Sequence, residues 1–332
     1  MSSADQDPAG APFPEDLPPV QPPSAGFIVQ LFVVPGLIVM AIVGVWLLFG
    51  KLATGEQDWQ SLVVELQHPN PLRRWRAASG LAQMVKADQQ LGTAGQHLAQ
   101  NRDIAQALAD VLAAAVKSGG QSDDDVKYET FLARSLGTFD LPDIVVPPLE
   151  QAMQPGSDRE VRKHAIWAIA VIADRHASGT EPLRVPGLIE ELTKVSHDED
   201  PLIRQITAFT LGLFPEADAA SRLEVMTEDA DSETRVNAAI ALARQGDVRG
   251  ASVFEEVLKS AAEPHEAGSN REFEQFLAIK NCLVAVQRVA GALNADERQK
   301  LAALIAPIAA DFREPGIRIA AKAALTALQE AR

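Results

Sequence analysis

Polar residues recur along this chain at one fixed spacing, and their types could do chemistry. An acidic or amide residue is followed four positions later by an arginine, and an apolar residue comes seven positions after that arginine. A guanidinium near a carboxylate can form a two-armed ion pair or bind an external anion. The copies are Asn70/Arg74/Leu81, Asp158/Arg162/Ile169, Asp200/Arg204/Leu211, Asp231/Arg235/Leu242 and Glu314/Arg318/Leu325.

No other arrangement of residues points to catalysis. The sequence has no Gly-x-Gly-x-x-Gly, no Walker loop, no Gly-x-Ser-x-Gly and no His-Glu-x-x-His. The run Asp123–Asp125 lacks the spaced ligands and distal glutamate of a calcium loop, so helix capping explains it. The single cysteine, Cys282, excludes an intramolecular disulfide and a cysteine-based zinc site. We therefore expect no enzyme activity, no metal and no cofactor.

The elements that position the recurring residues are predicted to be pairs of helices. In each pair the first helix carries apolar residues at helical spacing, as in residues 188–195. The second opens on a capping residue that is in places followed by proline, as in Asp200-Pro201, where the missing N–H costs nothing. The predicted pairs cover residues 57–86, 96–139, 142–175, 185–214, 217–246, 250–291 and 295–331.

The second helices resemble those of HEAT repeats. The resemblance is carried by Asp200-Pro-Leu-Ile-Arg204, Asp158-Arg-Glu-Val-Arg162 and Pro315-Gly-Ile-Arg318, and it covers residues 57–331. It implies an all-α fold, a right-handed α-solenoid of about seven helix pairs whose second helices line a concave side. It also implies a ladder of acids and arginines along the stack. The residues at ladder positions are Asp158, Arg162, Asp200, Arg204, Asp231, Arg235, Arg318 and Arg74.

These arginines are interpreted as structural, because a guanidinium can satisfy carboxylates and helix-end carbonyls of an adjacent repeat. Ligand binding is the alternative. Two repeats have lost the arginine and carry Glu129 or Phe276 in its place. Specificity should lie where the copies differ. The candidate partner contacts are Tyr128, Glu129, Phe273 and Phe276.

The charge balance argues against nucleic acid as a partner. The chain has 30 Lys and Arg against 45 Asp and Glu, a formal net charge of -15. Residues 1–26 contain four acids and no base, so the remainder carries 30 minus 41, or -11. Nucleic-acid binders usually have the opposite sign, since phosphate neutralisation supplies much of their affinity. We expect a protein partner.

The N-terminal part predicts a tail and a membrane anchor. Residues 1–26 are proline-rich and acidic, which predicts disorder, with a ligand for another protein as the alternative. Residues 27–50 carry no charge and would span about 36 Å as a helix, so they predict a single transmembrane helix, followed by a linker at 51–56. The alternative is a cleaved signal peptide, which would begin with a basic segment, whereas residues 1–26 contain no Lys or Arg. Lys51 and the arginines near residue 74 predict an outside N-terminus and a cytoplasmic repeat domain.

Together these observations predict a membrane-anchored HEAT-repeat scaffold or adaptor that binds a protein at the membrane face. The alternative is an enzyme or enzyme accessory that holds a substrate or cofactor in its groove. HEAT-like metal hydroxylases hold two irons with several His-Glu pairs, whereas this chain has one pair, His265-Glu266. The chromophore lyases of phycobilisomes also carry HEAT-like repeats, so a lyase-like function is one form of this alternative.

Overall fold

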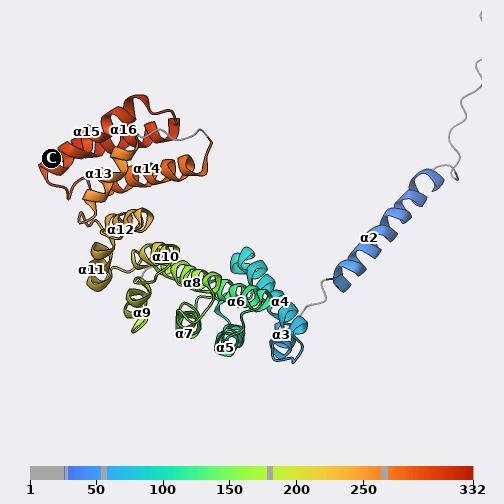
Figure 1. Ribbon diagram of the computed structural model, residues 1–332. Coiled ribbons are helices and arrows are strands. Elements are labelled where there is room, and N and C mark those ends of the chain that lie inside the picture. The colour runs from blue at the N-terminus through green and yellow to red at the C-terminus, as the bar shows by residue number, and fades with distance from the viewer. Residues whose placement is uncertain (1–25, 27–28, 54–57, 178–181, 263–267, 332) are drawn as a thin grey trace, which may run out of the picture. The chain divides into compact units, whose positions relative to one another are not determined.

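The computed structural model describes residue 26 and residues 29–53, 58–177, 182–262 and 268–331. The chain divides into two compact units, residues 1–57 and 58–332. All regular structure in the described ranges is helical, so the predicted all-helical repeat solenoid is confirmed (Figure 1). The helices are η1 (Val29–Val33), α2 (Val34–Ala53), α3 (Trp59–Glu65), α4 (Pro71–Gln90), η2 (Gly92–Ala94), η3 (Leu98–Gln100), α5 (Arg102–Ser118), α6 (Asp123–Leu136), α7 (Pro142–Ala152), α8 (Arg159–Ala177), α9 (Leu188–Val195), α10 (Pro201–Leu211), α11 (Ala217–Met226), α12 (Ser232–Arg244), α13 (Ala251–Ser260), α14 (Asn270–Val289), α15 (Ala295–Asp311) and α16 (Pro315–Glu330).

The first unit corrects the prediction of a membrane anchor. The described part of the apolar run, residues 29–50, is divided between the π-helix η1 and the α-helix α2. Among the described residues, no helix combines the length and the apolar character that a bilayer crossing requires. The predicted single-pass location, with its N-terminus outside and a cytoplasmic repeat domain, is therefore wrong.

Other predicted segments fall outside the described residues. The predicted tail is described only at Gly26, and of the predicted linker only residues 51–53 are described, as the end of α2. His265 and Glu266 also lie outside the described ranges.

The second unit consists of helix pairs that begin for reasons of local sequence. Asn70 and Asp200 cap α4 and α10 by accepting the amides of Leu72 and Leu202, each at 2.9 Å, and a proline occupies the first helical position. Ser122 and Asp125 form a reciprocal capping box at the start of α6. The pairs are α3/α4, α5/α6, α7/α8, α9/α10, α11/α12, α13/α14 and α15/α16.

The second helices of successive pairs pack side by side, from α4 through α6, α8, α10, α12 and α14 to α16. Glycine allows close approach where two of these helices end. A Cβ on Gly212 at the end of α10 would lie 2.5 Å from the Cβ of Ala241 on α12, and one on Gly137 would lie 3.2 Å from Ala168 on α8. The buried apolar residues form two clusters. One runs from Leu66 to Leu242, and the other from Ala239 to Leu328.

Candidate functional site

The repeat arginines hold the turns that precede their own helices. In four repeats the arginine donates Nη1 to two successive carbonyls, five and six residues earlier in the chain. Because one guanidinium satisfies two carbonyls at the end of the preceding turn, it fixes the angle between the helices of its pair. The bonds run from Arg74 to His68 (3.5 Å) and Pro69 (3.4 Å), from Arg204 to Asp198 (2.8 Å) and Glu199 (3.1 Å), from Arg235 to Asp229 (2.9 Å) and Ala230 (3.3 Å), and from Arg318 to Phe312 (2.5 Å) and Arg313 (3.5 Å).

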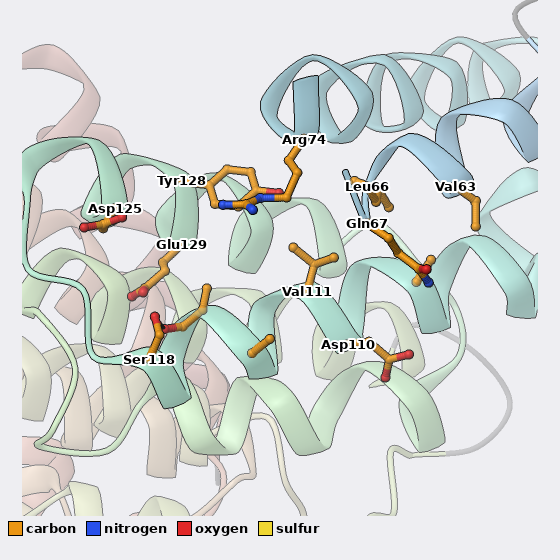
Figure 2. Close-up of a pocket in the computed structure, with 13 residues that line it drawn as sticks. Val63, Leu66, Gln67, Arg74, Asp110, Val111, Ser118, Asp125, Tyr128 and Glu129 are labelled. Atoms are coloured by element: carbon orange, nitrogen blue, oxygen red, sulfur yellow. Dashed lines mark hydrogen bonds between the residues drawn. The ribbon is translucent and has the colours of Figure 1, made fainter. Parts of the chain in front are cut away.

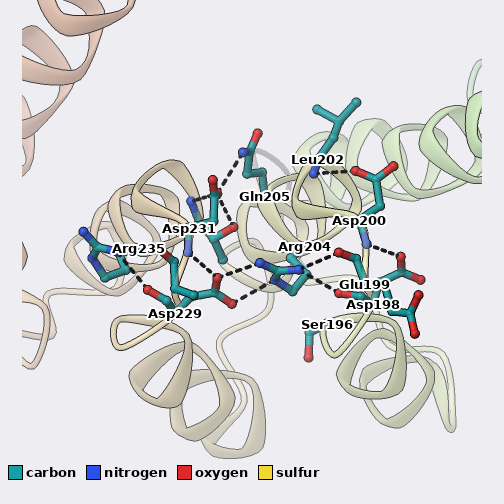
Figure 3. Close-up of polar contacts among 12 residues, drawn as sticks. Ser196, Asp198, Glu199, Asp200, Leu202, Arg204, Gln205, Asp229, Asp231 and Arg235 are labelled. Carbon is teal, nitrogen blue, oxygen red and sulfur yellow. Dashed lines mark hydrogen bonds and ion pairs between the residues drawn. The ribbon is translucent and has the colours of Figure 1, made fainter.

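Three of the repeat arginines also reach an acid of the next repeat. Arg204 donates Nε and Nη2 to the two carboxylate oxygens of Asp229 at 2.9 and 2.8 Å, the two-armed geometry seen in Figure 3. Both side chains are largely buried, at 14% and 13% exposed. Arg162 donates Nη2 to Asp198 and Nε to the Met153 carbonyl, and Arg235 donates Nε and Nη2 to Glu256. The turn acids Asp198 and Asp229 therefore link three consecutive second helices.

The acids predicted for the ladder lie two positions beyond Asp198 and Asp229 and mainly cap helices. Asp200 accepts the Leu202 amide and pairs with Arg159, while Asp231 accepts the Thr234 amide at 2.8 Å. Asp158 accepts the amide of Glu160 at 2.8 Å. An Asp-x-Asp pattern in the sequence could have identified the linking acids. Asp198 and Asp229 each accept the amide of the capping Asp two residues later, at 2.9 Å.

Asp229 and Asp231 are held ionised. Burial alone would raise the pKa of Asp229, but the hydrogen bonds from Arg204 and from the Asp231 amide outweigh it and hold that pKa below its ordinary value. The same balance of burial against hydrogen bonds from Gln205 and Thr234 lowers the pKa of Asp231. Since these polar groups are consumed by contacts within the chain, they leave little capacity for a ligand.

A pocket lies where the regular pattern is broken at Glu129. It has a volume of about 470 Å³, and α3, α4, α5 and α6 contribute its walls. Figure 2 shows the side chains of Arg74, Tyr128 and Glu129 around the same hollow as Val111. Its lining combines apolar side chains with three acids and one arginine. The residues are Val63, Leu66, Gln67, Arg74, Ala107, Asp110, Val111, Ala114, Ala115, Ser118, Asp125, Tyr128 and Glu129.

Glu129 is the unusual group of this pocket. Its residue is only 4% exposed, and no hydrogen bond within the described residues holds its carboxylate. Burial raises the pKa of Glu129, and the neighbouring acids Asp125 and Asp158 raise it further. In the regular repeats an arginine stands at this position, so its loss leaves Arg74 of the preceding repeat as the one cation among the residues that line the pocket.

Tyr128 is held rigidly beside Glu129. Its ring packs against Trp75, with ring centroids 5.4 Å apart, and Trp75 in turn packs against Phe131 at 5.2 Å. Burial raises the pKa of the Tyr128 hydroxyl, although the Arg74 guanidinium acts in the opposite direction. The hydroxyl is buried beside the Arg74 guanidinium at the wall of the pocket. A hydroxyl in this place can donate a hydrogen bond to a ligand.

The other two candidate contacts have different surroundings. Phe273 on α14 is 69% exposed. Phe276 lies one turn further along and packs edge-on against Phe312 at 5.5 Å, with the Arg313 guanidinium 4.8 Å from its ring centre. Phe276 therefore joins α14 to the turn between α15 and α16. Tyr128 and Glu129 thus lie together in one pocket, and neither phenylalanine lines that pocket.

The described residues contain no set of side chains arranged to bind a metal ion. Within the described residues, no group of three or more His, Cys, Asp or Glu side chains could hold an ion. Cys282 is buried between α13 and α14, and burial raises the pKa of its thiol.

Residues 185–266 match the family model described as HEAT repeats. That part of the chain is HEAT-like. It contains α9 to α13, and with them the linked residues Arg204, Asp229 and Arg235. A comparison with curated proteins found no match.

Solved structures of repeat proteins are similar to the chain at low scores. A designed armadillo repeat protein in complex with the peptide (KR)4 has 19% identity over 82% of this chain and 100% of that one, with a TM-score of 0.41. The complex of CpcE and CpcF of phycocyanin lyase from Nostoc sp. has 18% identity over 81% and 94%, with a TM-score of 0.41. Human deoxyhypusine hydroxylase in complex with glycerol has 18% identity over 85% and 99%, with a TM-score of 0.32. At these scores no ligand or activity carries over to this chain.

Proposed function

We propose that the chain is a HEAT-like repeat scaffold that binds a protein partner, and that the pocket of α3–α6 receives a basic side chain of that partner. The observation that carries the proposal is Glu129, a buried carboxylate without a hydrogen bond in a pocket with apolar walls. Asp110 and Asp125 also line the pocket, so its lining holds three acids and one cation, Arg74. A lysine side chain has an apolar stem and a cationic head, and both match this lining.

A catalytic role is not part of this proposal. Tyr128 and Glu129 have raised pKa values and share one pocket, as an acid catalyst would require. A catalytic pair also needs a third group that orients it by hydrogen bonding. Among the described residues no hydrogen bond orients the Glu129 carboxylate. The same two groups fit a binding pocket, where the ligand supplies the missing partner.

Binding of a basic side chain should be selective and should strengthen with pH. The probes are two fluorescein-labelled, C-terminally amidated peptides, Ala-Leu-Lys-Leu-Ala and the same peptide with norleucine in place of lysine, followed by fluorescence anisotropy. We expect the lysine peptide to bind about five- to tenfold more tightly at pH 8, the equivalent of about 1–1.4 kcal/mol. Because the pKa of Glu129 is raised, the preference should shrink as the pH falls and Glu129 takes up a proton.

Glu129→Gln should remove this preference, whereas Glu228→Gln, a change of an exposed glutamate on the α11–α12 turn, should preserve it. Equal binding of the two peptides to the unmodified chain would overturn the proposal, as would an undiminished preference in Glu129→Gln.

The same variant should alter stability in a pH-dependent way. A raised pKa means that the folded chain binds the Glu129 proton more tightly than the unfolded chain does. Stability therefore falls as the pH rises from the ordinary value of 4.5 through the folded-state pKa. We expect Glu129→Gln to unfold in urea with on the order of 1 kcal/mol more stability at pH 7.5, and with no gain near pH 4. A gain of equal size at both pH values would contradict the assigned cause.

A further inference from the structure

A second pocket lies on the second helices of later repeats and carries two arginines. It has a volume of about 320 Å³ and lies on α10, α12 and α14, which pack side by side. All of its lining residues come from these three helices. They are Phe209, Asn237, Ile240, Arg244, Asn281, Val284, Ala285 and Arg288. We call it the Arg244/Arg288 pocket.

The two arginines lie close enough to repel each other, and no acid of the described ranges is bound to them. Burial lowers the pKa of Arg244, and the charge of Arg288 lowers it further, while Asp174 acts in the opposite direction. In the described part of the chain neither guanidinium forms an ion pair or a hydrogen bond with another residue, although Arg162, Arg204, Arg235 and Arg249 all do. Acids outnumber Lys and Arg by 15 in the sequence, so a shortage of acids does not explain why these two arginines lack one.

Arg244 is positioned by aromatic side chains. Its guanidinium lies over the Phe209 ring, 4.6 Å from the ring centre. Phe209 also stacks against Trp167 of α8, with ring centroids 5.6 Å apart and an interplanar angle of 19°. Trp167 is 48% exposed. The stack holds one cation in place and leaves an aromatic surface beside the pocket.

The pocket also offers two side-chain amides. Asn237 donates Nδ2 to the Gln205 carbonyl at 3.3 Å, which fixes the orientation of that amide. Asn281 is exposed on α14 and forms no hydrogen bond with other described residues. Guanidinium and amide donors next to an apolar surface match a carboxylate on an extended peptide with an apolar neighbour. A polyanion fits less well, because the rest of the chain has a strong negative charge.

We infer that the Arg244/Arg288 pocket binds a glutamate or aspartate side chain of a partner protein, with an adjacent apolar residue on the Trp167/Phe209 surface. The inference rests on the proposed function in that it takes the ligand to be a protein. It adds a second subsite of opposite preference, because the α3–α6 pocket selects a cation and this one selects a carboxylate.

The test uses amidated peptides that carry an uncharged BODIPY label, so that the glutamate supplies the only carboxylate of its probe. The probes are Ala-Leu-Glu-Leu-Ala and the same peptide with glutamine or phosphoserine in place of glutamate. We expect the glutamate peptide to bind about tenfold more tightly than the glutamine peptide, the ratio that one charge-assisted pair supplies. Arg288→Gln should remove most of this preference, and Arg244→Gln/Arg288→Gln all of it.

Arg288→Gln is the main variant, because Arg244 also packs on Phe209. Arg102→Gln, at an exposed arginine of α5 that pairs with Asp143, is the matched control and should keep the preference. Equal binding of the glutamate and glutamine peptides would overturn the inference, and so would a preference that survives the double variant. Tighter binding of the phosphoserine peptide, lost in the double variant, would overturn the assignment of a carboxylate.

The lysine peptide of the earlier experiment separates the two proposals. If it binds through Glu129 while the glutamate peptide does not bind, this inference fails and the proposed function stands. If neither peptide binds the unmodified chain, both fail.

Discussion

Replacing Arg204 by alanine is expected to destabilise the second unit by on the order of 3 kcal/mol, and to lower Tm by roughly 5–10 °C. The substitution removes two bonds to Asp229 and two to carbonyls of the α9–α10 turn. Asp229 would then remain largely buried without its cation, which is the costly outcome for a buried pair. Helix content at low temperature should stay nearly unchanged, because the caps and apolar faces of α10 are intact. Circular dichroism against temperature measures both quantities.

The matched control is Arg102→Ala. Arg102 pairs with Asp143 at 2.7 Å, but both side chains are about 60% exposed, at 61% and 59%. An exposed pair contributes about 0–1 kcal/mol, so this variant should melt close to the unmodified chain. If Arg204→Ala and Arg102→Ala lower Tm equally, the pair of Arg204 with Asp229 contributes no more to stability than an exposed ion pair does.

Gly212→Ala is expected to cost about 2 kcal/mol, because the added methyl overpacks the contact between α10 and α12. The new Cβ would lie 2.5 Å from the Ala241 Cβ and 3.0 Å from its Cα. Both contacted atoms belong to Ala241 on α12, so the backbones of α10 and α12 must move apart. Urea unfolding of the variant measures the loss.

A reciprocal change separates crowding from the intrinsic properties of glycine. Gly212→Ala combined with Ala241→Gly restores the space, at a cost of about 1 kcal/mol for glycine within a helix. The double variant should therefore be more stable than the sum of the two single changes predicts. Gly291→Ala serves as a control, since a Cβ there meets nothing within 4 Å. Strict additivity of the two changes would show that the helices do not meet at Gly212.

The helix pairs could be predicted because their signals are local. A cap such as Asp200, a proline at the next position and apolar residues at helical spacing all act within one or two turns of the chain. Each predicted pair contains the two helices of an observed pair or most of their length. The position of the repeat arginine was equally readable, because its bonds to carbonyls five and six residues earlier are also local.

The partners of those arginines were harder to predict because they lie in the next repeat. Arg162 reaches Asp198, 36 residues away, and Arg204 reaches Asp229, 25 residues away. The variable step means that a fixed spacing cannot identify the acid, and the capping residue is the more conspicuous aspartate. The pocket at Glu129 posed the same difficulty, since Val63, Asp110 and Tyr128 come from three different helices. The loss of a repeat arginine nevertheless pointed to its location.

The two apolar clusters share a single helix, and this has a consequence for how the chain unfolds. Ala238, Ala241 and Leu242 of α12 pack into the cluster that begins at Leu66, while Ala239 and Ala243 of the same helix pack into the one that ends at Leu328. In a repeat protein each unit gains cooperativity only from the neighbours that it touches. Thermodynamic coupling between the two apolar clusters therefore passes mainly through α12, beside the ion pair of Arg249 with Glu224 on α11. Its amides should exchange with deuterium only when both clusters have opened, so α12 sets whether the halves melt together or one after the other.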